Sequence, residues 1–272
     1  MEENVNGQFL DGWALILGAS SGFGEACALE LAGAGMNIFG VHLDRKATLA
    51  NVDRITSQIK EKGRQAVFYN ANAADPEKRK AVLEEIEKTL STGPQRSQIR
   101  VMVHSLAFGT LKPLIADTPN EAIAQAQMEM TLDVMANSLV YWTQDLVARG
   151  FLGEGGRIFA MTSAGSARVW KSYGAVSAAK SALESHIRQL ALELGPRGIA
   201  VNAIRAGVTD TPALRKIPGH EEMIKMASAR NPMGRLTTPE DAAGAIMLLS
   251  HPKAQWVTGN VICVDGGEFI VD

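Results

Sequence analysis

The chain has 272 residues, of which 46% are hydrophobic and 21% are charged. This length fits one large α/β domain spanning 1–272 around a single core, and the composition argues against a disordered chain. Because 27 Lys and Arg face 29 Asp and Glu, the net charge of −2 offers no electrostatic footprint for nucleic acid or an anionic membrane. No apolar run approaches the roughly 20 residues of a membrane span. The polar, acidic start MEENVNGQFL predicts no signal peptide, so we expect a cytoplasmic protein.

Short apolar segments alternate with longer helical patterns along the whole chain. Strands are predicted at 13–18, 37–43, 65–71, 99–105, 156–163, 199–207 and 260–267. Helices are predicted at 24–35, 47–63, 75–90, 120–149, 173–194 and 239–250. Repeated β–α alternation with uniformly apolar strands predicts an α/β fold with a doubly wound, mostly parallel sheet and helices on both faces.

A glycine-rich turn joins the first predicted strand to the first helix. It reads Gly18-Ala-Ser-Ser-Gly22-Phe-Gly24, a spaced variant of the dinucleotide fingerprint. Pyrophosphate binding requires a tight turn, close backbone approach and a helix N-terminus aimed at negative charge. An ordinary glycine-rich loop is the alternative. The place of the turn favours a dinucleotide site made by Gly18, Ser20, Ser21, Gly22, Phe23 and Gly24.

The cofactor type depends on the end of the second strand, because an acidic residue there binds ribose hydroxyls and a basic one binds a 2′-phosphate. The strand ends Val-His-Leu at 41–43, without a carboxylate at its last position, and Arg45 and Lys46 follow. This order predicts NADPH, with Arg45 as a ligand. Asp44 keeps NADH open as the less favoured cofactor, and a solvated loop is the alternative for the two cations.

A tyrosine and a lysine lie seven residues apart, Tyr173 and Lys180 in SYGAVSAAKSALE. On a helix they lie within about 20° of one face, two turns apart. A nearby ammonium stabilises a phenolate and lowers the phenol pKa, so the two form a candidate acid pair beside the dinucleotide. The five histidines show no HxxH or HExxH spacing, and no metal site is predicted.

Four motifs together resemble the short-chain dehydrogenase/reductases, which have the Rossmann fold. They are the glycine turn, Ser163 at the end of the fifth strand, the Tyr/Lys helix, and T-G-N with V-D-G-G within 258–267. The resemblance spans about 12–267. It implies that Tyr173, Lys180 and Ser163 are catalytic, although a backbone-capping hydroxyl is an equal alternative for Ser163.

Three departures resemble one branch of that family, the enoyl-acyl carrier protein reductases. Val176 stands where the usual Tyr-x-x-x-Lys motif needs its tyrosine, which leaves the Tyr-x6-Lys spacing of the enoyl branch. The fourth strand ends in V-H-S-L-A rather than N-N-A-G. Met135 aligns with the usual catalytic asparagine, with Asn137 two residues further on. Because Ser163 holds the serine of ketoreductase-like members, the chain resembles the serine-retaining enoyl reductases.

Further cofactor contacts follow from the resemblance by position. Lys180 is expected to hold the nicotinamide ribose, Asn72 to lie at the adenine, and Ser105 to shape the cofactor pocket. The A-G-V-T-D-T segment at 206–211 aligns with the stretch that holds the nicotinamide amide, through Gly207 and Thr211. A helix cap is the alternative for Thr211.

The connection at 208–231 follows the carboxyl end of a strand, where α/β ligands bind, and its length and two prolines predict a substrate lid. Arg215 and Lys216 in it either meet an acidic acyl carrier protein or form a solvated helix end. The predicted helix 120–149 is apolar around most of its circumference. The family buries this helix between subunits, which implies a homotetramer.

The favoured hypothesis is an NADPH-dependent reductase of trans-2-enoyl thioesters, carried by acyl carrier protein or coenzyme A, in fatty acid synthesis. In it, hydride goes to the β-carbon and Tyr173 stabilises the enolate oxygen, where charge develops. A ketone or alcohol oxidoreductase of the 3-ketoacyl or hydroxysteroid type is the second hypothesis, favoured by Ser163. A non-catalytic dinucleotide sensor is the third, and the presence of both Tyr173 and Lys180 argues against it.

Overall fold

The computed structural model describes residues 10–92 and 98–271. The first nine residues of MEENVNGQFL, on which the signal-peptide prediction depends, lie outside the described part. Within the described part, no helix has both the length and the apolar character needed to cross a bilayer.

One seven-stranded parallel sheet forms the centre of the molecule, in the order β3-β2-β1-β4-β5-β6-β7. The strands are β1 (Trp13–Leu17), β2 (Asn37–His42), β3 (Ala66–Asn70), β4 (Ile99–His104), β5 (Arg157–Thr162), β6 (Ala200–Ala206) and β7 (Val261–Val264). The strand order reverses direction between β1 and β4, which places a ligand crevice at their carboxyl ends. The predicted doubly wound fold is confirmed.

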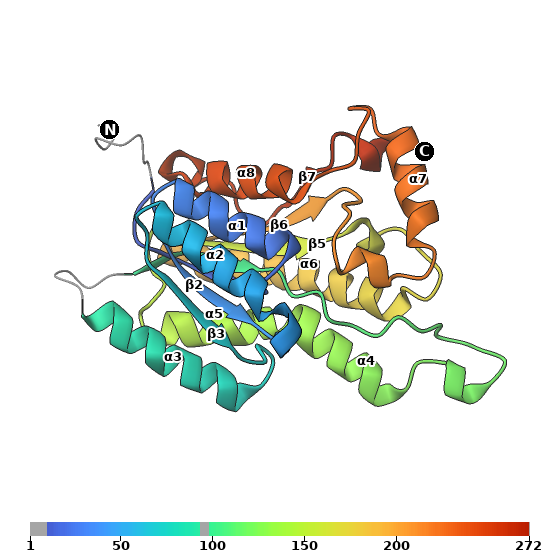
Figure 1. Ribbon diagram of the computed structural model, residues 1–272, viewed down its shortest axis with the longest axis horizontal. Helices are drawn as coiled ribbons and strands as arrows, with labels where there is room; N and C mark the ends of the chain where they lie inside the picture. The colour runs from blue at the N-terminus through green and yellow to red at the C-terminus, as the bar shows by residue number, and fades with distance from the viewer. Residues whose placement is uncertain (1–9, 93–97, 272) are drawn as a thin grey trace.

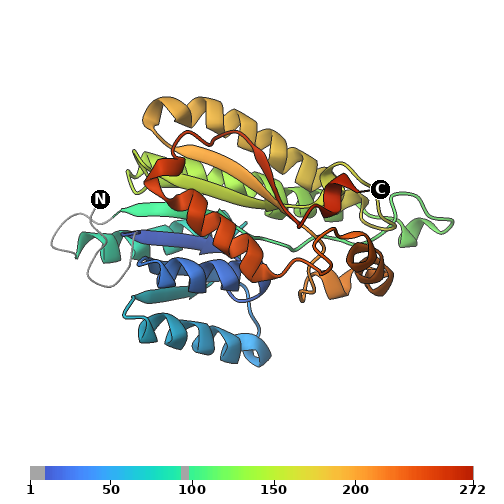
Figure 2. The same cartoon turned by 90° about the horizontal axis from the view of Figure 1, so that it is seen from above.

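Helices cover both faces of this sheet (Figure 1, Figure 2). On one face lie α1 (Gly22–Gly33), α2 (Leu49–Glu61) and α8 (Pro239–Ser250); on the other lie α3 (Pro76–Ser91), α5 (Ser138–Ala148) and α6 (Gly174–Leu194). Two more helices, α4 (Gln125–Leu132) and α7 (His220–Arg230), lie beyond the carboxyl ends of the strands in Figure 1.

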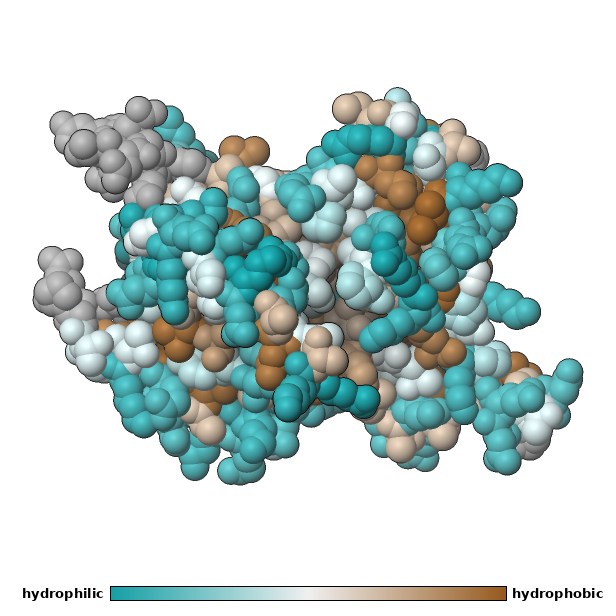
Figure 3. Space-filling view, viewed as in Figure 1, coloured by the Kyte–Doolittle hydropathy of each residue, from teal (hydrophilic) through white to brown (hydrophobic). Residues whose placement is uncertain are grey.

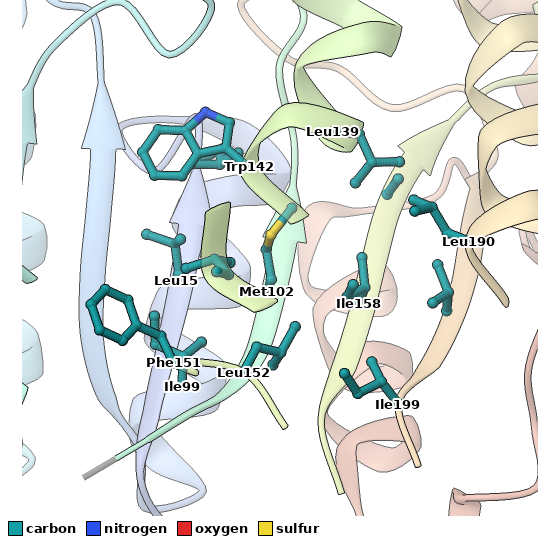
Figure 4. Close-up of a cluster of buried hydrophobic side chains, with 14 of the residues drawn as sticks. Leu15, Ile99, Met102, Leu139, Trp142, Phe151, Leu152, Ile158, Leu190 and Ile199 are labelled. Atoms are coloured by element: carbon teal, nitrogen blue, oxygen red, sulfur yellow. The ribbon is translucent and has the colours of Figure 1, made fainter. Parts of the chain in front are cut away.

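Each face of the sheet has its own core. Leu15 and Leu17 of β1 pack toward α3, α5 and α6, whereas their neighbours Ala14 and Ile16 pack toward α1, α2 and α8. Figure 4 shows part of the first core, in which Trp142 of α5 lies over the strands. Because both faces are buried, every position of β1 is apolar, which explains the absence of alternation in the sequence.

The prediction of one helix over 120–149 is wrong. A 3₁₀ turn covers Pro119–Glu121, α4 begins at Gln125, and a π-helical turn at Asp133–Asn137 separates α4 from α5. A π turn contains one more residue than an α turn, so the buried faces before and after it differ in phase. This phase change allows α4 to pack on α6 beside the pocket while α5 packs on the sheet.

Most other predicted elements agree with the structure to within three residues. Two differences bear on the site. The first helix begins at Gly22, inside the glycine turn, and α6 begins at Gly174, which leaves Tyr173 as its N-cap residue. The connection 208–231 contains structure that the sequence did not predict, a 3₁₀ turn at Leu214–Lys216 and the helix α7.

Candidate active site

A pocket of about 440 Å³ opens at the carboxyl ends of β1, β4, β5 and β6, beneath the 208–231 segment. The glycine turn, the end of β4, Ser163, the Tyr/Lys helix and the 206–211 segment all contribute residues to it, although these are up to about two hundred positions apart in the chain, whereas the 258–267 motif and Arg45 do not line it. Among the sequence-predicted residues, its lining includes Phe23, Ser105, Ser163, Tyr173, Lys180, Gly207 and Thr211.

Tyr173 stands at the start of α6 with its side chain facing this pocket. Burial raises the pKa of its phenol, and a hydrogen bond with Ser163 opposes that effect. The expectation that Lys180 lowers this pKa is therefore wrong. The reason is geometric. Lys180 lies two helical turns further along α6, and its ammonium is hydrogen-bonded to Met161 of β5 rather than to the phenol. Tyr173 is a neutral phenol at physiological pH and can donate a proton in a hydrogen bond.

Lys180 is buried, with 5% of its surface exposed, and its Nζ donates a hydrogen bond of 2.6 Å to the carbonyl oxygen of Met161. Burial lowers the pKa of this lysine from 10.5 to about 8, against the opposing charge of Glu184. Glu184 itself accepts hydrogen bonds from Thr162 at 2.8 Å and Arg205 at 3.2 Å. The lysine thus remains largely charged at pH 7.

Ser163 fits both of its interpretations at once. Its Oγ accepts the backbone N–H of Gly165 at 3.2 Å, which caps the 3₁₀ turn Ala164–Ser166, and it also bonds Tyr173. Val176 is buried against Met135 and Ala179. The position where a ketoreductase has its tyrosine is therefore occupied here by an apolar side chain without a hydroxyl group.

The glycine turn has the shape that a dinucleotide pyrophosphate needs. Gly18 has φ +88°, and a Cβ on Gly24 would collide with the carbonyl of Gly18, so the turn tolerates no side chain there. Ser21 is the N-cap of α1 but makes no side-chain cap bond, which leaves the first N–H groups of the helix for a ligand. A Cβ on Gly22 would lie 3.4 Å from Thr211, which brings the turn and the 206–211 segment together. These residues fit a dinucleotide.

Hydrogen bonds fix both the carboxylate and the backbone of Asp44, just after the end of β2. Burial alone would raise the pKa of this carboxyl, but hydrogen bonds from Ser20, Thr48 and His42 outweigh burial and lower it. Asn70 fixes the backbone of Asp44 with two further hydrogen bonds, at 3.1 and 2.9 Å. The carboxylate is thus already solvated by protein donors.

Arg45 and Lys46, by contrast, have exposed side chains. Within the described ranges, neither forms a salt bridge with an acidic side chain. Their charges are therefore available to a phosphate at this edge of the sheet.

Three residues named in the sequence analysis have hydrogen-bond partners of their own within the chain. Asn72 does not line the pocket; its side-chain oxygen accepts the N–H of Ala74 at 3.1 Å in a local turn after β3. Thr211 lines the pocket, and its hydroxyl also accepts the N–H of Leu214 at 3.2 Å, at the start of the 3₁₀ turn Leu214–Lys216. Asn137 is not among the lining residues of the pocket, and its Oδ1 lies 3.1 Å from Nε2 of His186 on α6.

Sequence reasoning missed several pocket residues. Glu268 is 3% exposed and accepts hydrogen bonds from the backbone of Val208 at 2.9 Å and from Arg230 at 3.3 Å, which ties the C-terminal segment to both ends of the lid. Trp170 donates to the carbonyl of Pro218 at 3.0 Å. No local pattern marks these residues, because their partners are 38 to 60 positions away.

Apolar side chains surround the mouth of the pocket. Phe108, Val169 and Met226 line it and are 60%, 93% and 47% exposed. In Figure 3 most of the visible face is hydrophilic, and apolar surface gathers over the region of α7. Within the described residues, no three His, Cys, Asp or Glu side chains are grouped so that they could hold a metal ion.

The fold and this pocket define an NAD(P)H-dependent oxidoreductase of the short-chain dehydrogenase/reductase class. The sequence model of the enoyl-(acyl carrier protein) reductase family matches residues 18–268. The chain belongs to this family, and the resemblance noted in the sequence is confirmed.

Individual relatives have mixed names. The NADH-type enoyl-acyl-carrier-protein reductase FabI of Bacillus cereus is 30% identical, with 93% of each chain covered. An NADPH-dependent aldehyde reductase-like protein of Arabidopsis thaliana, described as chloroplastic, is 28% identical, with 93% of each chain covered. A crystal structure of a dehydrogenase/reductase from Sinorhizobium meliloti superposes with a TM-score of 0.80 at 27% identity, covering 94% of each chain.

Proposed function

We propose that this protein reduces the carbon–carbon double bond of a trans-2-enoyl thioester with NADPH. The observation that carries the proposal is the pairing of a neutral, pocket-facing Tyr173 with a buried Val176. The hydroxyl group thus stands two helical turns from Lys180, about 4.5 Å further along the axis than a tyrosine at 176 would. This distance suits an oxygen displaced from the carbon that receives hydride.

The nicotinamide, when bound, supplies the hydride. The chain supplies the electrostatics: Tyr173 donates to the thioester oxygen, where negative charge develops as the β-carbon is reduced. Ser163, hydrogen-bonded to Tyr173, orients the phenol. Lys180 holds the nicotinamide ribose, and its positive charge stabilises the negative charge that develops on the substrate. Gly207 and Thr211 position the nicotinamide amide.

A second candidate is a ketone or aldehyde reductase of the same class. It is favoured by Ser163, which bonds Tyr173 as a carbonyl-orienting serine would, and by the relative named as an aldehyde reductase-like protein. The two functions are separated by oxidation of NADPH with crotonyl and acetoacetyl thioesters in parallel. We expect turnover of the crotonyl thioester, with the acetoacetyl thioester largely untouched. Faster turnover of the acetoacetyl thioester would promote the second candidate.

NADPH is the proposed cofactor, with NADH less favoured. Its support is the exposed pair Arg45 and Lys46 beside a carboxylate, Asp44, that already accepts hydrogen bonds from Ser20, Thr48 and His42. The NADH-type relative from Bacillus cereus supports the other choice. The amide nitrogen of Asn72 and the second lone pair of its oxygen remain for a cofactor contact, because the oxygen accepts one local hydrogen bond.

Arg45→Ala should weaken NADPH binding about tenfold and leave NADH binding within about twofold, because a charged hydrogen bond to phosphate contributes about 1.5–3 kcal/mol. Calorimetric titration of both cofactors measures this. Lys171→Ala, another exposed cation that lies away from the end of β2, is the matched control. Equal loss of both affinities would contradict the assignment of Arg45 to the 2′-phosphate.

The substrate carrier is proposed to be acyl carrier protein or coenzyme A, with fatty acid synthesis in the cytoplasm as the setting. The segment 208–231 is the proposed lid of this single domain, supported by its position over the pocket. Arg215 is neutralised by two hydrogen bonds to Asp210, at 2.7 and 2.9 Å. Lys216 lines the pocket with an exposed side chain and is the better candidate to meet an acidic carrier.

A homotetramer is the proposed assembly. Its support is the small, exposed Ala178 on α6, which permits a close approach, and Leu192 on the same helix, 72% exposed. Both positions lie on a surface that packing within one chain leaves open. We expect a mass near four times 29.1 kDa by light scattering at micromolar concentration, whereas a monomer would contradict the proposal.

A further inference from the structure

His104 contains a buried acceptor atom whose partner is not provided by the packing around it. The residue ends β4 and is fully buried. Its Nε2 lies 2.8 Å from the Oγ of Ser138, and that hydroxyl donates its only proton to the carbonyl of Val134, also at 2.8 Å. Nε2 must therefore carry the ring proton, and Nδ1 is left as a lone-pair acceptor. Within residues 10–92 and 98–271, Nδ1 has no hydrogen-bond partner.

Lys180 has the complementary excess of donors. Its ammonium has three N–H groups, and one hydrogen bond, to Met161, is formed with the described residues. Met161 directly follows Ala160, which is the register partner of His104 across β4 and β5. The imidazole and the ammonium therefore occupy adjacent positions at the carboxyl edge of the sheet.

The two groups also interact electrostatically. Burial, followed by the charge of Lys180, lowers the pKa of His104 to about 3. The imidazole is thus neutral throughout the working range of the protein, and Nδ1 stays an acceptor. An acceptor left unsatisfied in this position would be costly, whereas a bond to an ammonium is among the stronger hydrogen bonds.

We propose that Nδ1 of His104 accepts a hydrogen bond from one shared water, which in turn accepts one from the Lys180 ammonium, so that His104 is a positioning residue for the lysine. The ring is held in this orientation by Ser138, the first residue of α5 after the π-helical turn. This inference rests on the role given to Lys180 in the proposed function, but the proposed contact does not require bound substrate or cofactor.

The contact has a consequence for the charge of the lysine. A neutral acceptor stabilises the ammonium relative to the amine, so it keeps the pKa of Lys180 higher than burial alone would. The charged group that acts on this ammonium is Glu184 of α6, and Arg205 of β6 acts through Glu184. Glu184 acts in the same direction as His104, and Arg205 weakens it.

Two variants distinguish the roles of the two ring nitrogens of His104. His104→Asn places an amide oxygen near Nδ1, and His104→Gln places its amide near Nε2, where it keeps the contact with Ser138. We expect His104→Gln to move the titration of Lys180 to lower pH by about one unit, the equivalent of one charged hydrogen bond. His104→Asn and Ser138→Ala should each leave the titration within about 0.3 units of the wild type. NMR of ¹⁵N- and ¹³C-labelled lysine in the cofactor-free protein measures these shifts, and the alkaline limb of the kcat/KM profile should follow them.

An unshifted titration in His104→Gln would overturn the proposal. So would a shift in Ser138→Ala as large as that in His104→Gln, because the contact with α5 would then explain the effect. If His104→Gln does not fold, the ¹⁵N resonance of Nδ1 in the wild type decides, since a hydrogen-bonded acceptor is displaced from the position of a free one. The NMR result is independent of the reaction, so failure of the proposed function would appear separately, as a wild type that does not reduce enoyl thioesters.

Discussion

Tyr173→Phe should lower the rate of enoyl thioester reduction by about 10²–10³, because loss of one donor aimed at a developing oxyanion has this effect. The phenylalanine ring should preserve the packing at the start of α6, and Lys180 should keep its hydrogen bond to Met161, in which Tyr173 takes no part. Affinity for NADPH should therefore stay within a few-fold of the wild type. Single-turnover oxidation of NADPH and calorimetric titration measure the two quantities separately.

The chain provides a matched control for this substitution. Tyr141 lies on α5 under the guanidinium of Arg79, at 5.5 Å, and does not line the pocket. Tyr141→Phe should leave the rate unchanged. A Tyr173→Phe variant that retains a rate within a few-fold of the wild type would remove the phenol from the mechanism.

Ser163→Ala then separates the two candidate reactions. In an enoyl reductase Tyr173 alone satisfies the thioester oxygen, so the loss should be small. In a ketoreductase the serine helps to hold the carbonyl, and the loss should approach that of Tyr173→Phe. Because Ser163 also caps the turn at 164–166, thermal unfolding of the variant is needed to show that this turn survives.

Lys180→Met should abolish measurable cofactor binding and yet stabilise the cofactor-free protein at neutral pH. The lysine has 5% of its surface exposed, and its charge is only partly compensated. Replacement of a buried charge by an apolar side chain of similar length often stabilises a protein. Calorimetry with NADPH and urea unfolding without it measure the two effects.

The stability difference between the wild type and Lys180→Met should change with pH. The pKa of Lys180 is lowered from 10.5 to about 8 in the folded protein, so between these values the unfolded chain binds more protons. The burial penalty is therefore complete at pH 7 and fades as the pH rises from 8 to 10.5. The wild type should gain about 3 kcal/mol relative to Lys180→Met over this interval. A constant difference between the two proteins would contradict a charged, buried lysine.

Local sequence was sufficient for the strands, for most of the helices and for the fold class. The strands of the central sheet are short apolar runs because both of their faces are buried, and this pattern is visible without any contact information. The glycine turn is equally local, since Gly18 and Gly24 are required by the path of a few neighbouring residues. The Tyr173–Lys180 spacing and the motifs of the enoyl branch were likewise read directly from the chain.

The tertiary structure decided the state of each site residue. Lys180 was expected to act on the phenol of Tyr173, but it is held by Met161, and burial dominates both pKa values. The break of the predicted helix 120–149 by a π turn was also invisible, because an apolar circumference looks the same with or without one extra residue per turn.

The sequence by itself therefore determined the sheet, the dinucleotide turn and the identities of the candidate catalytic side chains. Only the folded chain brought Glu268 to Val208 and Arg230, and His104 to Ser138. The physical reason is the separation in sequence between the residues that interact. Strand formation and turn shape depend on residues near in sequence, whereas desolvation, charge compensation and hydrogen-bond partners depend on atoms that meet only after the chain has closed around the pocket.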